Sequence, residues 1–202
     1  MKRWMALLAL LMCAGLPAGA SAQNDAIFAN SYKLEAEKKY DAAAQAIAAL
    51  ANSGHEFAQL RMGWLAYLQG KYNDSISAYN RLLQSNPNSI DGRLGVTLPL
   101  LAQQRWQDAA AQARHVLQLS PWDYTAHVRL MIAEEALKQW QALEQHAASV
   151  AAIYASDATS LVYLARARAW QRNVAGAKQA YAQVLERYPA NEEARAYIKA
   201  NP

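Results

Sequence analysis

Turn-forming residues, cysteine and unbalanced charge are all scarce in this sequence. Only 8 glycines and 6 prolines occur in 202 residues, which argues against the turn-rich architecture of a β-sandwich or β-barrel. Lys and Arg number 20 against 16 Asp and Glu. This excess is too small to neutralise a run of phosphates, so nucleic acid is not expected as a partner. The hydrophobic share of 53% excludes intrinsic disorder, and the abundance of alanine and leucine predicts an all-α protein.

The N-terminal segment has the pattern of a secretory signal peptide. Lys2 and Arg3 precede an apolar run of 13 residues, Trp4 to Leu16, and small residues follow at positions 20–22. A membrane-spanning helix needs about 20 residues, so this run is too short to form one. We predict a signal peptide over residues 1–22, which is removed on export, and a mature chain over residues 23–202. The expected compartment is the periplasm.

The only cysteine, Cys13, lies within this predicted leader. Lipid anchoring through Cys13 is the alternative to cleavage after Ala22, although Met12 stands where a lipoprotein signal has a small residue. The mature chain has no thiol. A disulfide, a thiolate nucleophile and a cysteine-ligated metal are therefore excluded there.

The mature chain repeats with a period of 34 residues. Ser89, Asp123, Asp157 and Asn191 stand 34 apart, and all four side chains can accept hydrogen bonds from the first N–H groups of a helix. The same spacing separates Pro87 from Pro121 and links Tyr72, Trp106 and Trp140. Each expected cap begins a helical stretch, followed by a short polar break and a second helical stretch. The repeating unit is therefore a helix-turn-helix hairpin.

These residues resemble the tetratricopeptide repeat (TPR) family. Residues 62–87 match the family pattern at Met62, Gly63, Gly70, Tyr72, Ser75, Tyr79 and Pro87. Shorter matches follow at Trp106, Ala109 and Pro121, then at Leu164, Ala165, Ala177, Tyr181 and Pro189, and Tyr40 and Ala43 mark a first unit. The resemblance implies a right-handed superhelical solenoid of about five units, near residues 24–55, 56–89, 90–123, 124–157 and 158–190. A capping helix is expected over residues 191–200.

Two places depart from the family pattern. Met131 and Leu143 are bulky and Ala147 is small in the fourth unit, the reverse of the family, so its two helices are expected to lie further apart. Pro99 falls inside the first helix of the third unit, where it cannot donate to the carbonyl of Gly95. We expect a kink there, which could serve as a hinge.

In TPR arrays the first helix of each unit lines a concave groove, and residues at i, i+3, i+7 and i+10 share that face. The resemblance implies a groove that is apolar and aromatic at its centre, with charge only near its ends. Its expected lining is Phe28, Tyr32, Phe57, Leu60, Trp64, Tyr67, Leu94, Leu98, Leu101, Val128, Ile132, Val162, Arg166 and Trp170. The competing interpretation is a register shifted by one residue, which turns these side chains by about 100° into the packing between repeats.

A groove of this kind favours a non-enzymatic scaffold of the bacterial envelope that binds an apolar or amphipathic segment of a partner protein. The first alternative is a homo-oligomer held together by the same surface. The second is a helical enzyme acting on cell-wall glycan, with Glu134 or Glu135 as its carboxylate. Adjacent carboxylates point about 100° apart on a helix, so we expect a solvated pair instead.

No cofactor or metal is expected. His115, His127 and His146 fall on different helix faces at spacings that match no metal pair, so we expect surface or packing histidines. Arg166, Arg168 and Arg172 form a small basic cluster in the last unit. We expect exposed helix charges there, with an acidic partner or lipid headgroups as the alternative.

Overall fold

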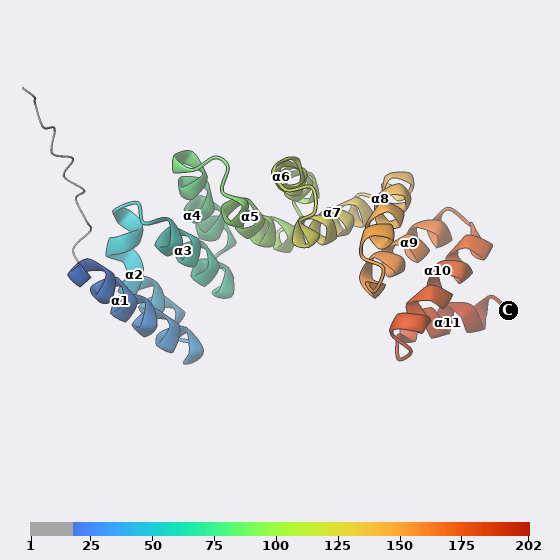
Figure 1. Ribbon diagram of the computed structural model, residues 1–202, viewed down its shortest axis with the longest axis horizontal. Coiled ribbons are helices and arrows are strands. Elements are labelled where there is room, and N and C mark those ends of the chain that lie inside the picture. Colours follow the sequence, from blue (N-terminus) through green and yellow to red (C-terminus); the bar gives the residue numbers. More distant parts are fainter. Residues whose placement is uncertain (1–17) are drawn as a thin grey trace, which may run out of the picture.

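The computed structural model describes residues 18–202, which form a curved array of helices (Figure 1). The helices are α1 (Ala18–Ala36), α2 (Tyr40–Asn52), α3 (Glu56–Leu68), α4 (Tyr72–Ser85), α5 (Ile90–Ala102), α6 (Trp106–Leu119), α7 (Tyr124–Ala136), α8 (Trp140–Ile153), α9 (Ala158–Trp170), α10 (Val174–Arg187) and α11 (Glu192–Ala200). The predicted leader lies outside the described residues except for residues 18–22, with which α1 begins. Cys13 and the apolar run of the leader lie outside them as well.

Consecutive helices pack as hairpins from α1–α2 to α9–α10, and α11 packs on α10 as the terminal helix. The chain has no strand between residues 18 and 202. This architecture confirms the expected all-α solenoid of helix-turn-helix units. A solenoid of this kind is stabilised by contacts between neighbouring units.

The four predicted helix caps are confirmed. The side chains of Ser89, Asp123, Asp157 and Asn191 each accept a hydrogen bond from a backbone N–H in the first turn of the helix that follows, at 3.2, 2.7, 2.9 and 2.8 Å for the bonds from Gly92, Ala126, Ser160 and Ala194. Such a cap contributes about 1 kcal/mol. The second unit lacks one, because His55 precedes α3 and its side chain makes no cap bond.

The turn inside each hairpin uses one residue in the left-handed region. These residues occupy the same place in successive units and have φ values of 59°, 72°, 58°, 56° and 62° at Lys38, Gly70, Gln104, Lys138 and Arg172. Only the second unit places a glycine there. A non-glycine residue costs about 1–2 kcal/mol in this conformation. The repeated turn geometry therefore holds even where the residue does not favour it.

Tight packing around one aromatic ring joins the second unit to the third. A Cβ atom on Gly63 would lie 2.6 Å from the ring of Tyr79, and one on Gly95 would lie 2.2 Å from it. Both glycines therefore leave the space that the ring fills. Ser75 adds a buried bond across the hairpin, since its hydroxyl donates to the carbonyl of Gly63 at 2.7 Å.

The fourth unit differs as expected. Met131, Leu143 and Ala147 are fully buried, and the backbones of α7 and α8 approach closely over a shorter stretch than those of any other hairpin. Pro99 is buried near the end of α5, which continues as helix through Ala102. A hinge at Pro99 stays a prediction.

Candidate binding groove

The first helices of the units line the inner side of the array. In Figure 1 the arch opens downward, with α5 and α7 along its inner side and α6 on its outer side. None of the residues expected in the groove is buried, and Tyr32 and Phe57 are 49% and 43% exposed. A register shifted by one residue would put the buried Ala58, Arg61 and Leu65 in the groove instead. The exposure pattern thus fits the expected register.

The structure brings four of these residues together around one cavity. Tyr32, Phe57, Leu60 and Trp64 line a hollow of about 340 Å³ between α1, α3 and α5, which we call the N-terminal cavity. Its other lining residues are Glu35, Arg61, Tyr79 and Asp91. The hollow continues along Phe57 and Leu60 past Asp91, where a further 470 Å³ is open. Three aromatic side chains therefore face a space that a side chain of another molecule can enter.

An ion pair lies beneath these aromatic side chains. Arg61 is only 5% exposed, and its Nη2 donates to Glu35 at 2.8 Å and to the hydroxyl of Ser31 at 2.9 Å. Its guanidinium lies 3.6 Å from the ring centre of Tyr32, a cation–π contact. The indole N–H of Trp64 donates to the other oxygen of Glu35 at 2.8 Å. Arg61 and Glu35 thus fix the orientation of two groove aromatics.

A charged side chain lies between α5 and α7, next to the expected centre of the groove. Arg129 reaches from α7 to α5, where its Nη1 donates to the carbonyl of Leu94 and, at 2.6 Å, to the hydroxyl of Thr97. Burial lowers the pKa of its guanidinium from the ordinary value. Leu94, Leu98 and Leu101 surround this part of the groove as partly exposed side chains.

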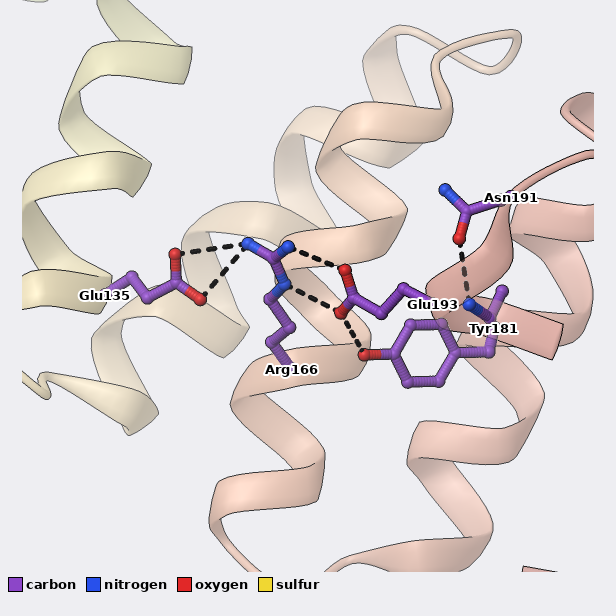
Figure 2. Close-up of polar contacts among 6 residues, drawn as sticks. Glu135, Arg166, Tyr181, Asn191 and Glu193 are labelled. Carbon is purple, nitrogen blue, oxygen red and sulfur yellow. Dashed lines mark hydrogen bonds and ion pairs between the residues drawn. The ribbon is translucent and has the colours of Figure 1, made fainter. Parts of the chain in front are cut away.

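At the C-terminal end, Arg166 is held between two carboxylates (Figure 2). It bonds Glu193 at 2.6 and 2.8 Å and Glu135 at 3.3 and 3.4 Å. The hydroxyl of Tyr181 donates to Glu193 at 2.6 Å. The bond from Arg166 is the main cause that lowers the pKa of Glu193, and burial raises that of Tyr181. We call Glu135, Arg166, Glu193 and Tyr181 the C-terminal ion cluster; it links α7, α9, α10 and α11.

Several expected neighbours are not brought together. Trp170 stacks on Trp140, with ring centres 5.1 Å apart and planes at 5°, so it lies at the turn between α9 and α10 rather than with the other groove aromatics. The three arginines of the basic cluster have separate surroundings, and of the three only Arg172 is exposed as expected. Arg168 pairs with Glu144 at 2.9 Å, and Arg172 forms the turn after α9, while Arg166 belongs to the C-terminal ion cluster.

The remaining groove residues lie between these regions. Phe28 rests against Phe57, with ring centres 5.0 Å apart, and Tyr67 stacks on Trp64 at 5.7 Å. Val128 and Val162 pack partly against the core of the last two units, and Ile132 is partly exposed on α7.

Glu134 is buried, so the expectation of a solvated carboxylate pair is wrong. It is 5% exposed and bonds Nδ1 of His146 at 2.9 Å. Nε2 of His146 in turn lies 2.9 Å from Nδ1 of His127, whose Nε2 lies 3.0 Å from the carbonyl of Pro121. Glu135 serves Arg166 instead, and the two carboxylates share no site. The packing of α7 against α8 thus brings together His127 and His146, which lie on different helices of the fourth unit.

No group of three or more His, Cys, Asp or Glu side chains within residues 18–202 is arranged to hold a metal ion. Over the same range, no helix is long and apolar enough to cross a membrane.

Comparison with known proteins agrees with this architecture. The sequence profile of the tetratricopeptide repeat family matches residues 57–89 and 159–191. The first segment corresponds to the second unit. The second corresponds to the fifth unit and ends at Asn191, where the capping helix begins. The chain is a tetratricopeptide repeat protein. No curated protein matches it in sequence.

Solved structures of TPR proteins share the fold over most of their length. MamA, residues 41 to the end, from Desulfovibrio magneticus RS-1 superposes with a TM-score of 0.75 at 14% identity, covering 88% of this chain and 99% of that one. YrrB, described as a TPR protein with an unusual peptide-binding site, gives 0.74 at 12% identity over 91% and 98%. A tetratricopeptide repeat protein from Parabacteroides merdae gives 0.76 at 13% over 86% and 70%. Such low identities establish the fold alone.

Proposed function

We propose that this protein is a non-enzymatic adaptor whose groove binds an apolar or amphipathic segment of a partner protein. The observation that carries the proposal is the N-terminal cavity, where Tyr32, Phe57 and Trp64 surround open space. Burying one such side chain contributes about 1.5–3 kcal/mol. Aromatic residues held at the centre of a pocket are the usual anchors of a protein interface.

The peptide-binding description of YrrB, which shares the fold, supports a peptide as the ligand. The leader pattern of residues 1–22 supports export, and the envelope is the compartment in which we expect the partner. Export is tested by the mass of the protein in a periplasmic fraction, where cleavage after Ala22 removes the leader.

Crosslinking capture from the envelope fraction tests the adaptor, with wild type, Phe57→Ala and Trp64→Ala compared. Trp122→Ala is the matched control, because Trp122 is 65% exposed in the connection between α6 and α7, outside the groove. We expect wild type and the control to capture the same partner and both groove variants to lose it by tenfold or more. Capture that persists in folded Trp64→Ala protein contradicts the proposal.

Self-association through the groove is the second outcome of that experiment. It predicts recovery of the protein itself, and a particle size in light scattering that rises with concentration and falls in Trp64→Glu. A single monomeric species at high concentration excludes it.

A further inference from the structure

Two arginines occupy the same place in different units. Arg61 lies in α3 and Arg129 in α7, two repeats of 34 residues apart. Each reaches back to a hydroxyl on the first helix of the preceding unit: Arg61 to Ser31 at 2.9 Å and Arg129 to Thr97 at 2.6 Å. The two sites are therefore equivalent copies of one arrangement.

The copies differ in the counter-charge. One turn beyond the hydroxyl, the first copy has Glu35, which bonds Arg61 at 2.8 Å. At the matching place, four residues after Thr97, the second copy has Leu101. Within residues 18–202 no carboxylate lies within salt-bridge distance of Arg129. Arg129 is thus the cation of a pair whose anion the chain does not supply.

The free side of Arg129 is not fully enclosed. Both of its hydrogen bonds come from Nη1, which leaves the donors of Nη2 and Nε for another acceptor. Neither atom is among the buried polar atoms that lack a partner, although Nε of Arg61 is. Partial burial makes a charge-assisted bond at this point stronger than one in open solvent.

We propose that Arg129 binds the carboxylate of an internal aspartate or glutamate in the partner segment, flanked there by apolar side chains. This inference rests on the proposed function of the groove. A planar guanidinium with free donors favours a carboxylate, which it can bind through two parallel bonds. Leu94, Leu98 and Leu101 line the groove beside it, so the residues next to the acid are apolar.

The acid is internal because the groove continues on both sides of Arg129. Trp64 and Tyr67 extend it toward the N-terminal cavity, and Ile132 and Val162 extend it toward α9. A segment that contacts both sides passes over Arg129 with its side chains, not with its end. Its carboxylate takes the place that Glu35 takes over Arg61.

A substitution at Leu101 provides the sharpest test. Leu101→Glu recreates the arrangement of Glu35 and supplies Arg129 with an anion from this chain. Leu101→Gln introduces a side chain of the same shape as glutamate but without its charge. Random peptides displayed on phage are selected on wild type, and those lost on Trp64→Ala are kept. Each kept peptide is then synthesised with an amidated C-terminus and compared with its Glu→Gln or Asp→Asn counterpart.

We expect the selected peptides to contain an internal acid flanked by apolar residues. The amide counterpart should bind wild type and Leu101→Gln about tenfold more weakly. On Leu101→Glu and on Arg129→Gln the two peptides should bind alike. Thermal unfolding of each variant shows whether it folds. If Arg129→Gln does not fold, the comparison of Leu101→Glu with Leu101→Gln still tests the proposal.

The failures are distinct. An acid preference that is as large on Leu101→Glu as on Leu101→Gln overturns the carboxylate site and leaves the groove intact. Peptides that depend on Trp64 but carry no acid, or that bind only with a free C-terminal carboxylate, overturn it as well. If no peptide depends on Trp64, the proposed function itself fails, and this inference fails with it.

Discussion

The two ends of the groove use an arginine and its carboxylates in opposite ways. At the N-terminal end, Arg61 and Glu35 lie beneath the aromatic side chains, and Tyr32 and Trp64 remain facing the cavity. At the C-terminal end, the partly exposed Arg166 bonds Glu135 and Glu193 and so ties α7, α9 and α11 together (Figure 2).

The difference shows how one repeat fold can make one end a contact surface and the other a support. The buried Arg61 contacts Tyr32 directly and orients Trp64 through Glu35, while both aromatic side chains still line the cavity. An arginine that bonds two carboxylates uses the donors that a ligand would need. Contact with a partner is therefore expected along the groove as far as the C-terminal ion cluster, which contributes rigidity instead.

Removing the counter-charge of Arg61 should give the largest effect. Glu35→Gln leaves a guanidinium that is 5% exposed without an anion, and loss of one partner of a buried pair costs about 3 kcal/mol or more. We expect this loss in the free energy of unfolding, measured by urea denaturation. Glu37→Gln is the control, since Glu37 pairs with exposed Lys39 and should change stability little. A loss below about 1 kcal/mol would show that the pair behaves as a surface salt bridge.

The second largest loss of stability is expected at Gly95, which packs against the ring of Tyr79. Gly95→Ala places a Cβ 2.2 Å from the ring, and overpacking of this kind costs about 1–3 kcal/mol. The C-terminal end has no such constraint, because Tyr181 meets Tyr197 at the matching place, with ring centres 4.8 Å apart.

A double-mutant cycle identifies the ring as the cause. Adding Tyr79→Leu should make Gly95→Ala much less destabilising than it is alone, since the shorter side chain vacates the space. Additive losses would place the strain elsewhere in α5.

Local rules predicted the helices and their caps, and the groove face stays a prediction. The cap residues follow from the 34-residue spacing and from side chains that accept backbone N–H bonds, which needs no knowledge of packing. The expected lining from Phe57 to Tyr67 takes its spacing from helical periodicity and its register from the resemblance to the TPR family. Neither prediction requires knowing how one unit packs against the next.

Contacts between units escaped prediction. The contacts of Arg61 could not be predicted, because its partners, Ser31 and Glu35, lie 30 and 26 residues away on another helix. His127 and His146 meet because α7 and α8 pack together, a geometry that periodicity within one helix does not contain. The one available signal was the repeat itself: aligning the units places Arg61 over Arg129 and Glu35 over Leu101.

A smaller effect is expected from the C-terminal ion cluster. Glu193→Gln removes one of the two carboxylates that bond Arg166 and leaves Glu135. Because Arg166 and Glu193 are each about one-third exposed, the free energy of unfolding at neutral pH should fall by about 1 kcal/mol. The pKa of Glu193 is lowered in the fold. Its contribution is therefore present above the unfolded value of about 4.3 and is lost as pH falls through the lower folded value.

Unfolding measured across this acid range compares wild type with the variant. Wild type should lose the extra stability on acidification, whereas Glu193→Gln should begin without it. Parallel curves that never converge would assign the effect to packing of Tyr181 instead of to charge.

The smallest effect is expected from His127. Burial is the main cause that lowers its pKa, so the unfolded chain takes up a proton before the folded one does as pH falls below about 6.5. Stability is complete above that value and declines as pH falls toward the lower folded pKa. His127→Gln should flatten this decline. NMR titration of the His127 ring decides the cause directly: a midpoint below about 6.5 supports the buried neutral ring, and a midpoint above it contradicts this account.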